Sequence, residues 1–216
     1  MTSPDSLLTQ ARRMPLIAIL RGLAPSNAAH IGEVLVESGF RALEVPLNRP
    51  GALQCIETLA KLLPSDVLVG GGTMLTVGDV NDVYAAGGRL MVAPNCDTRV
   101  IERAVTLGML AAPGVVTPSE AFTALQAGAH ALKLFPSELV GPGGLKALKS
   151  VLPDGTDVWP VGGITPESMA AWAASGATGF GIGSQLFTPE KSPGQVAAMA
   201  QKFVASWRAI ERFTSP

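Results

Sequence analysis

The stretch LMVAPNCDTRVIERAVTLGMLAAPGVV, residues 90–116, contains the structural unit from which this chain is built. Two apolar runs, 90–95 and 109–116, flank a segment whose apolar residues recur at helical spacing. Asp97 stands where a helix N-cap is favoured, and Gly108 precedes the second run, as a glycine that closes a helix does. Nearly continuous apolar runs separated by a helix are typical of parallel strands covered by helices. The stretch therefore predicts a β-α-β unit.

The same unit recurs along the whole chain. Eight apolar runs fall at residues 15–21, 42–47, 67–73, 90–95, 109–116, 131–136, 158–163 and 179–184. A glycine lies near the end of many intervening helical segments, at Gly39, Gly87, Gly108, Gly128 and Gly176. Eight β-α units predict one α/β domain over residues 1–216, a single (β/α)8 TIM barrel with an extra N-terminal helix at 5–13 and a long final helix at 194–212. An open, doubly wound parallel sheet is the alternative.

The composition narrows the class of protein. The net charge of -1 offers no electrostatic attraction for nucleic acid. Charged residues make up 15%, against about 25% in ordinary domains, which suggests that subunits bury surface between them. No segment approaches the ~20 apolar residues that span a bilayer, and the first residues do not resemble a secretion signal. Cys55 and Cys96 lack a CxxC spacing. We expect a cytoplasmic homo-oligomer with no nucleic-acid or membrane partner.

Few charged residues interrupt the apolar runs. Arg41, Arg89 and Asp157 fall at strand entrances, where we expect the chain to lie near solvent, which leaves Arg21, Glu44 and Lys133. Side chains alternate along a strand, so Glu44 and Lys133 each lie on the face opposite to the larger aliphatic neighbours. Because those aliphatic side chains belong against the helices, Glu44 and Lys133 are predicted to point into the barrel.

A buried amine and a buried carboxyl indicate chemistry. A buried salt bridge, or a lysine that extends to the barrel mouth, is the alternative, but a buried pair is often no more stabilising than apolar packing. Burial lowers the pKa of a lysine, so Lys133 becomes a free amine able to attack a ketone. The imine of a 2-keto acid stabilises the carbanion left when the neighbouring C–C bond breaks, and Glu44 is placed to move protons. Lys133 and Glu44 are the predicted catalytic residues.

Several loops at the predicted strand ends suit anions. Barrels of this kind often hold phosphate with the loops after strands 7 and 8, which here contain Gly162, Gly163, Gly183 and Ser184. Thr73 ends the GGGT run and suits a carboxylate. Arg21 ends the first run and can bind either anion, with the carboxylate favoured. Arg49 is a second anion contact or a solvated loop charge.

A metal site has little support in the sequence. The chain contains two histidines, His30 and His130, so a three-histidine site is impossible. The predicted strand ends offer no cluster of acids that would hold Mg²⁺. We expect no metal and no cofactor.

The segments IAILRG, EVPLN, GGGTML, VAPN, PGVVTPSEA, ALKLFP and PVGGITPE, in this order and spacing, resemble the family of 2-keto-3-deoxy-6-phosphogluconate and 2-dehydro-3-deoxy-6-phosphogalactonate aldolases. The resemblance covers nearly the whole chain. It implies a class I pyruvate aldolase on a (β/α)8 barrel, usually a homotrimer, acting on a phosphorylated 2-keto-3-deoxy sugar acid. It also implies the Schiff-base lysine at Lys133 and the proton-transferring glutamate at Glu44.

Finer motifs favour one branch of that family. The phosphogluconate enzymes typically carry a threonine before the Gly-Gly of strand 7, where this chain has Val161, and EVTLRT and SPG motifs where it has EVPLN and APN. The two substrates differ in configuration at C4, and Val161 cannot hydrogen-bond the C4 hydroxyl. The expected reaction is cleavage of 2-dehydro-3-deoxy-6-phospho-D-galactonate to pyruvate and D-glyceraldehyde 3-phosphate, in D-galactonate catabolism. The gluconate epimer is the alternative substrate, and a sugar-phosphate isomerase or binder is a more distant alternative.

Overall fold

Each of the eight predicted apolar runs contains a parallel strand. The computed structural model describes residues 4–214. Its strands are β1 (Leu16–Ile19), β2 (Ala42–Pro46), β3 (Leu68–Gly72), β4 (Leu90–Val92), β5 (Leu110–Ala112), β6 (Gly114–Val115), β7 (Ala131–Leu134), β8 (Asp157–Pro160) and β9 (Phe180–Ile182). The run 109–116 is divided at Pro113 into β5 and β6. All ladders between the strands are parallel, as predicted.

Helices alternate with most of the strands, and several of them begin or end at capping residues of the kinds that the sequence predicts. They are α1 (Pro4–Arg13), α2 (Ala28–Glu37), α3 (Ala52–Leu62), α4 (Val77–Ala85), α5 (Thr98–Thr106), α6 (Pro118–Gln126), α7 (Ser137–Lys149), α8 (Met169–Ala174) and α9 (Pro193–Thr214), with a 3₁₀ turn, η1 (Pro25–Asn27), before α2. Thr76 and Thr117 form capping boxes at α4 and α6, and Asp97 caps α5. The five predicted helix-closing glycines all adopt positive φ, between 72° and 106°. The leading and final helices are confirmed.

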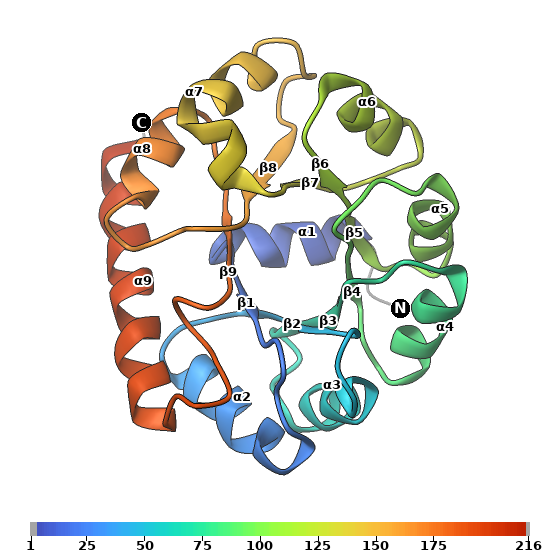
Figure 1. The fold of residues 1–216 in the computed structure, drawn as a ribbon, viewed down its shortest axis with the longest axis vertical. Helices are drawn as coiled ribbons and strands as arrows, with labels where there is room; N and C mark the ends of the chain where they lie inside the picture. Colours follow the sequence, from blue (N-terminus) through green and yellow to red (C-terminus); the bar gives the residue numbers. More distant parts are fainter. Residues whose placement is uncertain (1–3, 215–216) are drawn as a thin grey trace.

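The strands form an α/β fold with a curled parallel sheet. One sheet has the order β5-β4-β3-β2-β1-β9 and the other β6-β7-β8. Hydrogen bonds link the first part of β7 to β5 and the residue after it, from His130 N to Ala111 O (3.0 Å) and from Lys133 N to Pro113 O (2.9 Å). On the other side, Thr178 N donates to Val158 O (3.1 Å), next to β9. In Figure 1 helices α2 to α9 surround the strands on the outside, and α1 lies across the middle of the view.

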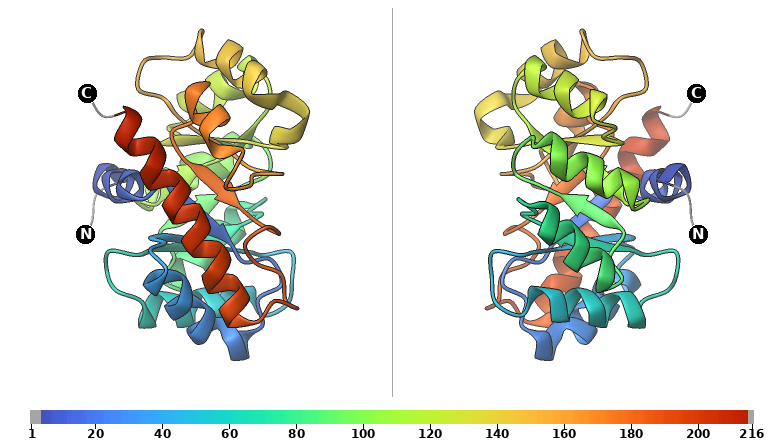
Figure 2. Two further views of the ribbon diagram at one scale, coloured as in Figure 1. Left: turned by 90° about the vertical axis from the view of Figure 1, so that its left-hand side faces the viewer. Right: turned by 90° about the vertical axis from the view of Figure 1, so that its right-hand side faces the viewer.

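Apolar side chains pack on both faces of the curled sheet. Leu43, Val45, Leu132 and Leu134 belong to the outer cluster, against the helices. Alternate residues, such as Ala42 and Ala131, face inward and pack together with Leu7 and Ala11 of α1. Figure 2 shows α1 across one end of the molecule. The alternation predicted for β2 and β7 is confirmed, so Glu44 and Lys133 lie on the inner face.

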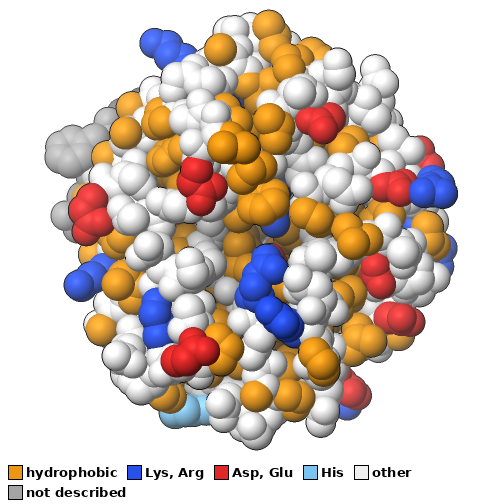
Figure 3. Space-filling view, in the orientation of Figure 1, with side chains coloured by type: hydrophobic (Ala, Val, Ile, Leu, Met, Phe, Trp, Pro, Cys, Tyr) orange, Lys and Arg blue, Asp and Glu red, His pale blue; other side chains and the backbone are white. Residues whose placement is uncertain are grey.

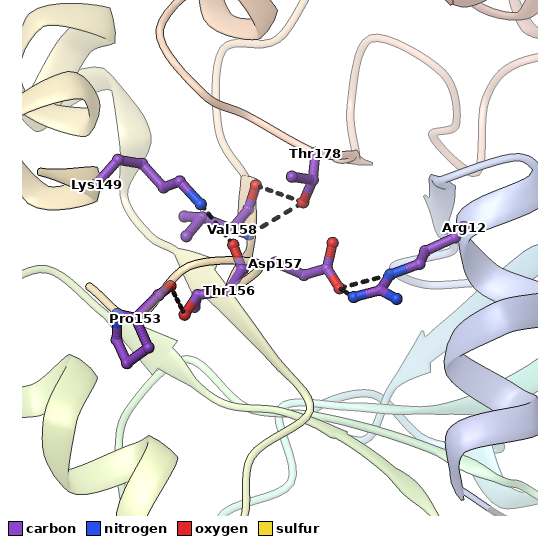
Figure 4. A network of polar contacts seen from close by, with 7 residues as sticks. All are labelled: Arg12, Lys149, Pro153, Thr156, Asp157, Val158 and Thr178. Atoms are coloured by element: carbon purple, nitrogen blue, oxygen red, sulfur yellow. Dashed lines mark hydrogen bonds and ion pairs between the residues drawn. The ribbon is translucent and has the colours of Figure 1, made fainter. Parts of the chain in front are cut away.

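One expectation about charged residues was wrong. Asp157, at the entrance of β8, is buried rather than near solvent, because α1 covers this end of the sheet. Its carboxylate accepts a hydrogen bond from Nε of Arg12 in α1 at 2.9 Å and forms an ion pair with a terminal guanidinium nitrogen of the same residue at 2.7 Å (Figure 4). Arg41 and Arg89 remain partly exposed, as expected. The ion pair attaches α1 to β8 below the site described next.

Within residues 4–214, no helix combines the length and apolar character needed to cross a membrane.

Candidate active site

A cavity of about 660 Å³ opens at the carboxyl ends of the strands. Its lining includes the charged side chains Arg21, Arg49, Glu138 and Glu190, together with the loops after β8 and β9. Figure 3 views this face and shows Lys or Arg side chains gathered at its hollowed centre. Ligand sites in barrels and open parallel sheets lie at this end of the strands.

A smaller cavity adjoins it on the inner face of the sheet. The centre of a water molecule can occupy about 10 Å³ of this cavity, which is roughly the room that one water needs. It is lined by Ile17, Ile19, Glu44, Val92, Ala112, Lys133, Trp159, Val161 and Gly181. Ile19, Val161 and Gly181 line both cavities, which places the inner one below the mouth. Glu44 and Lys133 are the charged groups in an otherwise apolar wall.

Lys133 is an isolated buried amine. Its side chain is 7% exposed, and Nζ lies 4.8 Å from the centre of the Phe135 ring. Among the described residues, the amine forms no hydrogen bond and no ion pair within 4.0 Å. Burial lowers the pKa of Lys133, the negative charge of Glu44 opposes this shift, and the positive charge of Arg21 adds to it. The neutral, nucleophilic form of this amine is therefore more accessible than that of a solvated lysine.

Glu44 faces the same cavity from β2. The residue is 1% exposed, and its Oε2 atom has no hydrogen-bond partner among the described residues. Burial raises its pKa to about 7, although the charges of Lys133 and Arg21 act in the opposite direction. The carboxyl packs directly on Gly72, where a β-carbon would collide with it. Glu44 is thus a carboxyl able to gain and lose a proton near neutral pH.

The alternative of a buried salt bridge is not realised. The ion pairs between described residues do not include one between Glu44 and Lys133 at 4.0 Å or less. Both groups face one cavity without neutralising each other, which is the arrangement that nucleophilic and acid–base chemistry requires.

Unpaired backbone amides line the larger cavity. The amides of Gly162, Gly163, Gly183 and Ser184 donate no hydrogen bond to another described residue. Gly162 and Gly163 both adopt positive φ (112° and 61°), a conformation that glycine adopts without strain. Free amides at a concave surface suit an anion such as phosphate.

Neighbouring side chains hold these loops in place. Ser137 is fully buried and its Oγ donates to Gly162 O at 2.7 Å. Lys191 Nζ donates to the carbonyls of Ser184 and Gln185 at 2.8 and 2.5 Å. The carbonyls of the loops are thereby occupied, and their amides stay available.

The structure brings together most of the predicted site residues. Val161 lines both cavities, and the residues on the larger one are Arg21, Gly162, Gly163, Gly183 and Ser184. Arg49, left open between an anion contact and a solvated charge, also lines the larger cavity. Thr73 lines neither cavity, although its φ of 54° is unusual for a residue other than glycine.

Sequence reasoning missed Trp159 in the inner wall, and Phe135 and Glu138 in the outer one. Phe135 had a signal, because it lies two residues after Lys133 on the same face of the run. Glu138 had none, since its position depends on how α7 packs beside β8. In the part of the chain that the structure describes, no group of three or more His, Cys, Asp or Glu residues is arranged to hold a metal.

A buried unpaired amine, a carboxyl that titrates near neutral pH and a rim of free amides define the kind of site that class I aldolases use. The chain belongs to the KDPG and KHG aldolase family, whose sequence model matches residues 5–201. The resemblance in the motifs is confirmed. The 2-dehydro-3-deoxy-6-phosphogalactonate aldolase of Escherichia coli (strain K12) is 46% identical over 197 residues, covering 91% of this chain and 96% of that protein.

Two solved structures are also similar. One, described as native KDPGal, superimposes with a TM-score of 0.91 and 43% identity, covering 93% of this chain and 97% of the other. The other is KDPG aldolase from Legionella pneumophila with pyruvate captured as a covalent carbinolamine intermediate; it has a TM-score of 0.80 and 26% identity, and covers 97% of this chain and 98% of the other.

Proposed function

We propose that this chain is a class I aldolase that cleaves 2-dehydro-3-deoxy-6-phospho-D-galactonate to pyruvate and D-glyceraldehyde 3-phosphate, in D-galactonate catabolism. The observation that carries this proposal is Lys133, a buried amine without a charge partner that shares a cavity with Glu44. The 46% identity to an aldolase named for this substrate supports the choice of substrate.

In the proposed mechanism, Lys133 Nζ attacks the C2 carbonyl carbon of the sugar acid. The carbinolamine loses water to give an imine, and Glu44 supplies the proton for the departing hydroxyl. Glu44, now a carboxylate, removes the proton of the C4 hydroxyl. The C3–C4 bond breaks, its electron pair moves into the imine, and the aldehyde leaves. Glu44 then returns the proton to C3 of the enamine, and water releases pyruvate from Lys133.

The two anionic ends of the substrate are assigned to different parts of the larger cavity. The amides of Gly162, Gly163, Gly183 and Ser184 suit the phosphate, because they are unpaired and line the mouth. Arg21 is assigned to the carboxylate, since it follows β1 in the lining of the larger cavity and its charge acts on both Glu44 and Lys133. Thr73 is a second proposed carboxylate contact, less well supported because it lines neither cavity.

We propose that the two sheets form one (β/α)8 barrel, extended by α1, and that the chain is a single domain. The hydrogen bonds on either side of the β6-β7-β8 sheet support closure, since they join it to β5 and to the start of β9. The isolated bridge between Val161 and Gly181 continues the second connection.

We also propose a cytoplasmic homotrimer without nucleic-acid or membrane partners. The support comes from the low charged fraction of 15% and from large apolar side chains left exposed on the single chain. Those near the first turns of α4 and α6 are Leu75, Val77, Val116 and Phe122. Apolar groups of this size are candidates for burial between subunits.

The covalent step is tested by incubating the protein with pyruvate and sodium borohydride, which reduces an imine to a stable amine. We expect one pyruvate adduct per chain, on the peptide that contains Lys133. An adduct on another lysine, or none, would contradict the proposed mechanism.

The choice of epimer is tested at Val161. Val161→Thr adds a hydroxyl beside the catalytic cavity, and one hydrogen bond is worth about 1 kcal/mol. We expect the ratio of kcat/KM for the galactonate epimer to that for the gluconate epimer to fall by about fivefold. Val158→Thr is a matched control, because Val158 lies on β8, three residues before Val161, but in the outer cluster. If wild type and Val161→Thr show equal ratios, Val161 does not determine the preference between the two epimers.

A further inference from the structure

Glu138 covers part of the proposed phosphate site. It lies in the first turn of α7, and its side chain reaches the turn formed by Gly162 and Gly163. A β-carbon on Gly162 would collide with the Glu138 carboxylate, and one on Gly163 would lie 2.8 Å from its Cγ. The glycines therefore provide the space that the glutamate occupies, at the loop whose amides are unpaired.

Hydrogen bonds hold the backbone beside Glu138 in place, whereas none holds its carboxylate. The neighbouring Ser137 donates from its amide to Val161 O at 3.0 Å and from its hydroxyl to Gly162 O at 2.7 Å. These two bonds attach the start of α7 to the loop after β8. The Glu138 carboxylate itself forms no hydrogen bond or ion pair with another described residue, and the residue is exposed. It can leave the turn without breaking a polar contact.

The other charged residues that line the cavity do not contact the Gly162–Gly163 turn as Glu138 does. Arg21 and Arg49 are positive and follow β1 and β2, and Glu190 is negative and follows β9. Glu190 lines the same cavity, but the atoms that would crowd a β-carbon on Gly162 or Gly163 belong to Glu138. The two acids thus share a cavity, but of the two only Glu138 packs against the Gly162–Gly163 turn.

We propose that Glu138 weakens the binding of a phosphate group at the Gly162–Gly163 turn, so that free phosphate occupies the turn poorly, whereas a complete substrate, which makes further contacts, displaces the carboxylate. The inference rests on the proposed function. Two negative groups at van der Waals distance in water repel by an amount equivalent to about fivefold in affinity. For inorganic phosphate, only contacts with this loop region can offset the repulsion from Glu138. A whole sugar acid gains in addition from Arg21 and from the bond to Lys133, so it displaces the carboxylate.

The test uses inorganic phosphate as the probe, both as an inhibitor of cleavage and in direct titration of the full chain. In Glu138→Gln we expect the dissociation constant of phosphate to fall about fivefold or more. The matched control is Glu190→Gln, which removes the same charge from the same cavity, and its constant should change less than twofold. Glu138→Asp keeps the acid in the first turn of α7 but shortens its reach, and should give an intermediate gain.

Unchanged or weaker phosphate binding in Glu138→Gln overturns the inference, as does an equal gain in both glutamine variants, which would indicate a general charge effect. The pyruvate adduct on Lys133 is measured in the same preparations. If the adduct forms normally while phosphate binding is unaltered in Glu138→Gln, only the proposed role of Glu138 is contradicted. If the wild type forms no adduct, the proposed function itself is contradicted.

Discussion

Lys133→Met is expected to abolish aldol cleavage, with kcat at least about 10⁴-fold below that of the wild type. Methionine keeps the length and packing of the buried side chain but has no amine, so the imine cannot form. The remaining groups can bind the substrate and move protons, yet no electron sink is available for the breaking C3–C4 bond. The measurement is pyruvate release from the phosphorylated sugar acid, combined with borohydride trapping of pyruvate.

The variant should remain folded, because the wall around Lys133 is apolar apart from Glu44 and the amine has no hydrogen bond or ion pair to lose. Lys149→Met is a suitable control. Lys149 lies on α7, and its Nζ donates to Thr156 O at 2.7 Å (Figure 4), outside both cavities. Its loss should cost about 1 kcal/mol of stability and leave kcat within twofold. Cleavage above about 1% of the wild-type rate in Lys133→Met would indicate that another route exists.

Glu44→Gln is expected to reduce activity and increase stability. Loss of a general acid–base group typically lowers the rate by about 10² to 10⁴. The stability gain follows from burial, which raises the pKa of Glu44 from 4.5 to about 7. Because the folded-state pKa is higher than that of the unfolded chain, the wild type loses stability as pH rises from about 4.5 to about 7. Glutamine is neutral throughout and avoids that loss.

The size of the effect follows from the shift, since one pKa unit corresponds to about 1.4 kcal/mol. We expect Glu44→Gln to unfold with a free energy on the order of 3 kcal/mol higher than the wild type at pH 8, and with little difference at pH 4.5. Urea unfolding at the two pH values measures this. Glu57→Gln, at an exposed site on α3, should show no such pH-dependent gain. A constant difference at both pH values would mean that Glu44 is not held protonated by burial.

These expectations depend on a pair of residues that local patterning identified. Glu44 lies on the same face of its strand as Ala42, and Lys133 on the same face as Ala131. Successive side chains of an extended chain point to opposite faces because of its backbone geometry. The side of the sheet that each faces could therefore be predicted once the bulky neighbours were assigned to the helices. The helix ends were predictable for a similar reason, because a residue with positive φ is needed there and glycine meets that need locally.

Contacts between distant segments were beyond such reasoning. Asp157 was expected near solvent and is buried, because α1 returns across the end of the sheet and brings Arg12 to it. Thr73 was expected at the mouth, but it lines neither cavity. Glu138 carried no signal at all. Each of these positions depends on how a helix or loop packs against residues far away in the sequence.

The sequence by itself determined the order of strands and helices, the inward direction of Glu44 and Lys133, and the glycines that leave amides free at two loops. These features follow from the periodicity of side chains along the chain and from the conformations that single residues allow. Only the tertiary structure decided that the amine and the carboxyl share one cavity without pairing, and that Glu138 lies over the Gly162–Gly163 turn. Distances between side chains on different strands depend on the curvature of the sheet and the packing of its helices, which no local pattern encodes.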